Sequence, residues 1–215
     1  MEETAQVINL NDIFWTFQGE GKNVGRCALF VRLPYCNYSC PWCDTDYNSI
    51  NFKLTEEEFK VWLDKQPANF AVVTGGEPTV NKHFGIIITW LKKYGFEVAI
   101  ESNGSKFHEA NRFIDLLTIS PKKHAPRHLP EFYIDPEYLN YAVKYPDKIE
   151  FKYVVEEGFD FSHVDKLVQG LKGVRISLSP EFNILEDSMK RILEYCVKNP
   201  SVRYSLQTHK YLEIK

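Results

Sequence analysis

Short apolar runs recur along the chain, and longer stretches with helical periodicity lie between them. The runs are rich in β-branched and aromatic residues and predict strands at residues 28–33, 70–74, 97–101, 117–120, 149–155, 174–178 and 202–206. The periodic stretches predict helices at residues 55–65, 84–94, 107–116, 136–144, 161–171 and 187–198. Alternating strands and helices with short connections predict an α/β chain whose mostly parallel sheet is covered by helices.

Two helix starts carry specific capping residues. Thr55 and Glu58 have the spacing of a capping box, in which each side chain accepts a hydrogen bond from the other residue's backbone. Asp135 precedes Pro136, and proline is favoured at the first position of a helix. These residues support the helices predicted from the periodicity.

About seven strands in this order form either an incomplete (β/α) barrel or a doubly wound sheet, and the pattern alone does not separate the two. In both arrangements the active site lies at the carboxyl ends of the strands. Chemically distinctive segments follow the strands there: Cys36, residues 75–77, 102–104, 120–122 and 179–181. We therefore expect these segments to meet in one site.

Composition limits the classes of function. The 215 residues are 44% hydrophobic, which predicts a folded core and fits a single domain over residues 1–215. The net charge of −3 gives no reason to expect nucleic acid or an anionic membrane as partner. No apolar run approaches the roughly 20 residues of a membrane span. The acidic, polar start does not resemble a secretory signal, so we expect a cytoplasmic protein.

The cysteines indicate a metal centre. Of five cysteines, Cys36, Cys40 and Cys43 crowd into one loop, whereas Cys27 and Cys196 stand apart and are expected to pack as small apolar residues. A structural zinc site needs a fourth ligand, which His124 or His128 can offer. An iron–sulfur cube bound by three thiolates keeps one iron open for a substrate or cofactor.

The spacing C-x3-C-x2-C after a first strand, with residues 75–77 following the next, resembles the radical S-adenosylmethionine superfamily. In that superfamily the open iron of a [4Fe-4S] cluster chelates S-adenosylmethionine and cleaves it to a 5′-deoxyadenosyl radical. The resemblance implies that the glycine-rich turn receives the amino group of the cofactor. On its own, such a turn is an ordinary strand–helix connection.

Further segments narrow the resemblance. Gln18-Gly-Glu-Gly, Cys43-Asp-Thr and Gln207-Thr-His-Lys stand among motifs that closely resemble the 7-carboxy-7-deazaguanine synthase family, from about residue 8 to the C-terminus. The resemblance implies conversion of 6-carboxy-5,6,7,8-tetrahydropterin to 7-carboxy-7-deazaguanine with loss of ammonia, on the route to queuosine and related deazapurines. It also implies an incomplete barrel, a homodimer, magnesium, and a reductant such as flavodoxin or ferredoxin.

The same resemblance assigns roles to individual residues. The cluster ligands are Cys36, Cys40 and Cys43, and the magnesium ligand is Thr45. The S-adenosylmethionine contacts are Trp42, Cys43, Asp44, Gly76, Ser120, Pro121, Lys122, Ser179, Pro180, Glu181 and Phe182. The pterin contacts are Phe17, Gln18, Gly19, Glu20, Arg32, Thr74 and His209. Ser102 departs from the pattern, since a threonine is more usual there.

Simpler interpretations remain open beside these roles. Glu20 and Arg32 can form a solvated ion pair of little energetic value. Thr45 can cap a turn, and His209 can be a surface residue. A glycyl-radical activase shares the cysteine spacing but acts on a protein, and a zinc- or cluster-stabilised binding module needs no catalysis.

Overall fold

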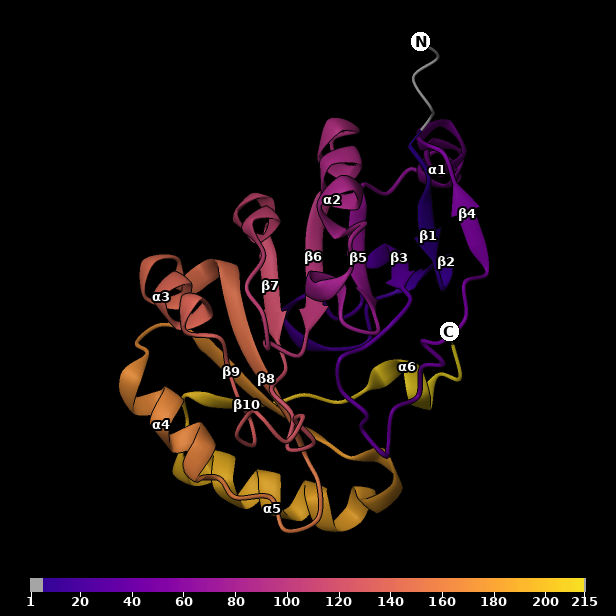
Figure 1. Cartoon of the computed structure of the whole chain (residues 1–215). Helices are drawn as coiled ribbons and strands as arrows, with labels where there is room; N and C mark the ends of the chain where they lie inside the picture. Colours follow the sequence, from indigo (N-terminus) through magenta and orange to yellow (C-terminus); the bar gives the residue numbers. More distant parts are fainter. Residues whose placement is uncertain (1–5, 215) are drawn as a thin grey trace.

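A computed structural model describes residues 6–214, which form an eight-stranded sheet in the order β10-β9-β8-β7-β6-β5-β3-β2 (Figure 1). The strands are β2 (Asp12–Phe17), β3 (Cys27–Leu33), β5 (Phe70–Gly75), β6 (Glu97–Ser102), β7 (Leu116–Ile119), β8 (Ile149–Val155), β9 (Arg175–Pro180) and β10 (Val202–Tyr204). All neighbours pair in parallel except β2, which runs antiparallel to β3. A separate antiparallel pair joins β1 (Ile8–Leu10) to β4 (Phe52–Leu54).

Helices follow most strands and lie along one face of the sheet. They are α1 (Glu56–Leu63), α2 (Phe84–Lys93), α3 (Pro136–Lys144), α4 (Ser162–Gly170) and α5 (Leu185–Lys198). The short α6 (Thr208–Tyr211) lies instead near the carboxyl ends of the strands, where it contacts Gly19. Both predicted caps are confirmed: Thr55 and Glu58 form the capping box of α1, and the Asp135 side chain accepts from the first turn of α3. No helix within residues 6–214 is long and apolar enough to span a membrane.

Alternating residues of each strand face two environments. On the helix-covered face, Val31, Ile100 and Phe151 join one large apolar cluster with residues of the helices. On the opposite face a small apolar cluster that includes Phe70 and Val72 lies near the amino ends of the strands. Polar and charged side chains occupy that face nearer the carboxyl ends. The core therefore lies between sheet and helices, and the other face is left for a site.

The sheet does not close. Strands β2 and β10 are its two edges, and no ladder joins them among residues 6–214. This confirms the predicted α/β fold with a mostly parallel sheet in an incomplete barrel, and the chain after β10 crosses the gap toward the residues that follow β2. The single-domain organisation over residues 1–215 stays a prediction.

The predicted helix at 107–116 is wrong. Only a five-residue 3-10 helix, Glu109–Phe113, forms there. The Phe107 backbone N–H donates to Asp135 Oδ2 at 2.9 Å, and the His108 side chain accepts from Ala110 N. Because the chain must reach β7 at Leu116, these local bonds replace a helical turn. The other predicted helices and all seven predicted strands are present, with ends that differ by at most two residues.

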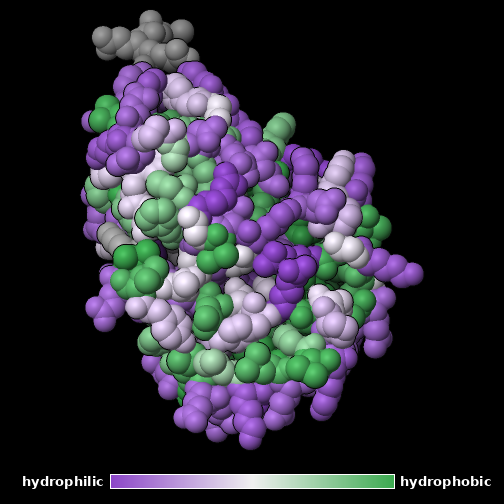
Figure 2. Space-filling view, turned by 180° about the vertical axis from the view of Figure 1, so that it is seen from behind, coloured by the Kyte–Doolittle hydropathy of each residue, from purple (hydrophilic) through white to green (hydrophobic). Residues whose placement is uncertain are grey.

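Figure 2 shows the molecule from behind, where hydrophobic residues lie in small groups among polar ones.

Candidate active site

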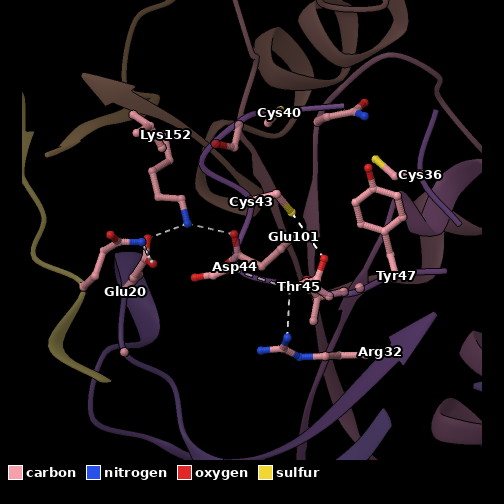
Figure 3. Close-up of a pocket in the computed structure, with 18 of the residues that line it drawn as sticks. Glu20, Arg32, Cys36, Cys40, Cys43, Asp44, Thr45, Tyr47, Glu101 and Lys152 are labelled. Carbon is pink, nitrogen blue, oxygen red and sulfur yellow. Dashed lines mark hydrogen bonds and ion pairs between the residues drawn. The ribbon is translucent and has the colours of Figure 1, made fainter. Parts of the chain in front are cut away.

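A cavity of about 240 Å³ opens at the carboxyl ends of the strands, as expected for this sheet order. Its wall includes the ends of β3, β5, β6 and β8, the loop that carries the three clustered cysteines, and the C-terminal segment. Figure 3 shows that the side chains of Arg32, Glu101 and Lys152 come from three different strands and point into the same space. The sheet thus brings distant parts of the sequence together.

The cysteine loop, residues 34–51, lies directly on the glycine-rich turn after β5. Gly76 N donates to Leu33 O, and Glu77 N donates to Tyr35 O, both at 2.9 Å. A Cβ at Gly76 would lie 1.9 Å from Tyr35 O, so only glycine permits this approach. The turn therefore positions the backbone that leads into Cys36.

The carboxylate of Glu77 is used inside the protein. It is buried, and it accepts from Thr79 N at 3.0 Å, Ser102 Oγ at 2.8 Å and Asn103 N at 2.6 Å. Asn103 Nδ2 in turn donates to Asn37 Oδ1 at 2.9 Å, next to the first cysteine. The Glu77 side chain therefore ties the end of β6, and through Asn103 the cysteine loop, to this turn. The contact of the turn with the cofactor's amino group stays a prediction.

The three clustered cysteines are free thiols that line one cavity. Burial raises the pKa of Cys36 to about 11, and the nearby carboxylate of Glu77 adds to the effect. Burial also raises the pKa of Cys40, against the opposing charge of Lys122. Such thiols are poor nucleophiles at neutral pH, and a bound metal is what converts them to thiolates.

This donor set fits an iron–sulfur cube better than one metal ion. Within residues 6–214, no three His, Cys, Asp or Glu side chains converge closely enough to bind a single ion. His124, the possible zinc ligand, instead lies with Nε2 2.9 Å from Glu156 Oε2. A cube needs no convergence on one point, because each thiolate binds a different iron. Three soft sulfur donors on one loop match that requirement.

The side chains of Arg32 and Thr45 are neighbours on the cavity wall. Arg32 Nη1 donates to Thr45 Oγ1 at 2.9 Å (Figure 3). Thr45 Oγ1 also donates to Asp44 Oδ1 at 3.4 Å. The solvated ion pair between Arg32 and Glu20 does not form, because Glu20 pairs with Lys152 instead.

Three charged side chains meet at the floor of the cavity. Lys152 Nζ lies 2.7 Å from Glu20 Oε2 and 3.0 Å from Glu101 Oε2. Burial would raise the pKa of Glu20, but the Lys152 ammonium and a hydrogen bond from Gln207 lower it to about 2. Burial raises the pKa of Glu101, and the neighbouring Glu20 charge adds to that rise. Burial acts to lower the pKa of Lys152, but the two carboxylates outweigh it and raise the pKa.

The C-terminal segment closes one side of the cavity. Thr208 N donates to Gly19 O at 3.0 Å, and Gln207 Nε2 donates to Glu20 Oε1 at 2.9 Å. The His209 ring packs so tightly on Gly19 that a Cβ there would lie 2.3 Å from its Nδ1. Burial lowers the pKa of His209, with the Glu20 charge opposing. His209 is therefore a half-buried wall residue rather than a surface residue.

Most predicted site residues line this cavity. They are Phe17, Gln18, Gly19, Glu20, Arg32, Cys36, Cys40, Trp42, Cys43, Asp44, Thr45, Thr74, Gly76, Ser120, Lys122, Glu181, Phe182 and His209. Three do not reach the wall, and these are Pro121, Ser179 and Pro180. Glu101, Lys152 and Gln207 line it without a predicted role. A charged residue among apolar ones in a strand is the signal that could have found Glu101 and Lys152. Gln207 lies outside the strands, and its only signal is the motif that it begins.

Comparison with known proteins gives consistent matches. The model of the radical SAM superfamily matches residues 30–157. The 7-carboxy-7-deazaguanine synthase of Aquifex aeolicus is 30% identical over 224 aligned residues, covering 100% of this chain and 98% of the relative. The Haemophilus influenzae protein of the same name is 32% identical, covering 96% and 94%.

The solved structures agree with the sequence matches. The crystal structure of QueE from Escherichia coli aligns with a TM-score of 0.74 and 26% identity, covering 94% of this chain and 95% of that one. SuiB of Streptococcus suis, solved with S-adenosylmethionine, aligns with a TM-score of 0.54 at 12% identity over 81% of this chain and 48% of that one, which shows a shared fold only.

Proposed function

The chain belongs to the radical SAM superfamily and, within it, to the 7-carboxy-7-deazaguanine synthase family, and we propose that it converts 6-carboxy-5,6,7,8-tetrahydropterin to 7-carboxy-7-deazaguanine with release of ammonia. The reaction is a ring contraction on the route to queuosine and related deazapurines. The observation that carries the proposal is the single cavity in which three free thiols, Arg32 and the Glu20–Lys152–Glu101 cluster meet.

Membership of the superfamily implies a [4Fe-4S] cluster and S-adenosylmethionine as cofactors, together with an electron donor. When bound, they supply a carbon-centred radical that removes one hydrogen atom from the substrate. We assign Cys36, Cys40 and Cys43 to the cluster. The cavity wall near these thiols is available to hold S-adenosylmethionine. It is formed by Trp42, Asp44, Gly76, Ser120, Lys122, Glu181 and Phe182.

The protein must aim the radical, because a carbon radical does not choose among C–H bonds by itself. The substrate carries a carboxylate on the carbon that we propose to react. Arg32 offers a planar fork of donors that matches a carboxylate bidentately. We propose that Gln18, Glu20 and Thr74 bind the pterin edges, while Phe17, Gly19 and His209 shape the rest of its pocket.

We also propose that Thr45 binds magnesium. Its hydroxyl oxygen lies 2.9 Å from the Arg32 guanidinium, so a cation at Thr45 and Arg32 can reach the same substrate carboxylate. Magnesium retains waters and takes few protein oxygens, so one hydroxyl plus substrate oxygens suffices.

The family resemblance further supports a homodimer and a flavodoxin or ferredoxin as the reductant, and both remain proposals. We place the protein in the cytoplasm, where thiols stay reduced. The five cysteines, all free, support that location.

Anaerobic turnover tests the proposal. Reconstituted protein, dithionite, S-adenosylmethionine, magnesium and carboxytetrahydropterin should yield the carboxydeazaguanine, identified by mass spectrometry. Deuterium at the carbon that bears the carboxylate should appear in the S-adenosylmethionine pool, because the family returns the hydrogen to its cofactor. Absence of both product and label would contradict the function, and product without label would contradict only the site of hydrogen removal.

A further inference from the structure

Lys152 joins two carboxylates that come from opposite sides of the cavity. Glu20 follows β2 at one edge of the sheet, whereas Glu101 lies in β6 near its centre. The Lys152 ammonium contacts both, and Figure 3 shows it between them. The side-chain exposures of Lys152, Glu20 and Glu101 are 9%, 10% and 19%, so these contacts are nearly shielded from water.

Hydrogen bonds close this cluster into a ring. Gln18 Nε2 donates to Glu101 Oε1 at 3.2 Å, and Gln18 Oε1 accepts from Glu20 N at 3.2 Å. Gln207, which is not part of this ring, donates a hydrogen bond from Nε2 to the second carboxylate oxygen of Glu20, Oε1, at 2.9 Å. Because every member has partners on two sides, the orientation of the Glu20 carboxylate is determined by several bonds at once.

Stability does not explain such a cluster. Burying charged groups costs solvation free energy, and their mutual attraction barely offsets that cost. Apolar residues of similar size often give the folded protein equal stability. The alternate positions of β8 show that apolar residues suit this strand, since Phe151 and Tyr153 are fully buried in the core. With both carboxylates ionised, the cluster of Glu20, Lys152 and Glu101 itself carries a net charge of −1. A role in binding accounts for both features.

We infer that Lys152 is a positioning residue for the substrate, which ties Glu20 to Glu101 so that Glu20 presents a charged acceptor at one place on the cavity floor. This inference rests on the proposed function. A tetrahydropterin carries ring N–H groups and an exocyclic amino group, which are hydrogen-bond donors. A carboxylate has about four acceptor positions, so Glu20 keeps free ones after bonding Lys152 and Gln207.

Lys152→Met tests the inference, because methionine keeps the length of the side chain and removes its charge. The KM for carboxytetrahydropterin should rise roughly 30-fold, about 2 kcal/mol, while kcat falls much less. Lys198→Met is the matched control, since Lys198 is exposed at the end of α5, and it should leave KM unchanged. Iron content and the unfolding temperature of Lys152→Met are measured in parallel.

The pH profile separates positioning from a merely structural role. Without Lys152, the adjacent carboxylates of Glu20 and Glu101 should share one proton, because two like charges resist simultaneous ionisation. That proton replaces the lost positive charge. The ratio of variant to wild-type KM should therefore fall toward one as the pH decreases from 8.5 to about 6.

Three other titratable groups face this cluster, and they are Glu150 on β8, Lys122 after β7 and His209 in α6. The Lys152 charge lowers the pKa of two of them, Lys122 and His209. Loss of that charge raises both pKa values, so any proton that they gain at lower pH also restores positive charge and acts in the same direction as the shared proton. An unchanged KM in Lys152→Met, or a raised KM whose ratio is flat with pH, would overturn the inference. Wild-type protein without turnover would instead contradict the proposed function.

Discussion

Strand β8 shows the difference between the two faces of the sheet within a few residues. Phe151 and Tyr153 point into the helix-covered core, where Tyr153 packs on the rings of Phe132 and Phe159. Glu150 and Lys152 point the other way, toward Thr118 and the cavity cluster, respectively. Both pairs are buried, but one is surrounded by carbon and the other by hydrogen-bond partners.

The difference teaches that burial serves two separate purposes here. On the helix-covered face, each large apolar side chain contributes about 1.5–3 kcal/mol by leaving water. On the cavity face, buried charges contribute little net stability and need their partners to be tolerated at all. Substitutions one position apart should therefore have different consequences, the first kind for stability and the second for binding and chemistry.

Cys40→Ala, a substitution on the cavity face, should have the largest effect on activity. Removing one thiolate leaves the cluster short of a protein bond, so iron should be lost after reconstitution and activity should fall to background. Cys196→Ser is the control and should keep both. Loss of iron from folded Cys196→Ser would show that the ligand assignment is incorrect.

Phe151→Ala tests the other face at nearly the same place in the sheet. Deleting this fully buried ring should lower the free energy of unfolding by about 3–5 kcal/mol, measured by denaturant titration. Val143→Ala, at an exposed position of α3, should change it by less than about 0.5 kcal/mol. If Phe151→Ala folds but has a strongly raised KM for the substrate, the proposed difference between the two faces of the sheet is contradicted.

Arg32→Lys keeps the charge of the cavity but removes the planar fork. We expect kcat/KM to fall roughly 10- to 100-fold, about 1.4–2.7 kcal/mol, with little change in unfolding temperature. A tetrahydropterin without the carboxylate should be a poor substrate of the wild-type enzyme. Equal turnover of that analogue would remove the proposed role of Arg32.

Thr45→Val should have the smallest effect, because it deletes one hydroxyl and retains the shape of the side chain. The stimulation of turnover by magnesium should diminish, and it is measured by titrating the metal into chelator-treated enzyme. Retention of the full stimulation would leave Thr45 with only its hydrogen bonds to Arg32 and Asp44.

Much of the fold followed from local patterns, because the parallel strands are short segments rich in apolar residues and several helix ends carry capping residues. The pattern missed β2, in which the polar residues Asp12 and Thr16 lie on either side of Ile13, Phe14 and Trp15. It also missed β1 and β4, three-residue strands that pair with each other although 41 residues of chain, 11–51, separate them. It misjudged 107–116, where a side-chain bond to Asp135 decides the structure.

The site divides in the same way. The cysteine loop and Gly76 are recognisable because their roles depend on local spacing and on the missing side chain. The roles of Glu101 and Lys152 depend on a meeting of β6, β8 and the end of β2, which no local pattern contains. The sequence shows that Glu101 and Lys152 are charged residues in strands, but it does not show that they pair with each other.

The contacts of the C-terminal segment also have a consequence for how the protein is made. Thr208 and Gly19, which bond to each other across the gap in the sheet, are 189 residues apart. A ribosome adds about 5–20 residues per second, so Gly19 waits roughly 10 to 40 s for its partner to be synthesised. During that interval most of the helix-covered core can already assemble. The cavity is thus among the last parts of the nascent chain to be completed, and ligand binding should mark the end of maturation rather than an early step.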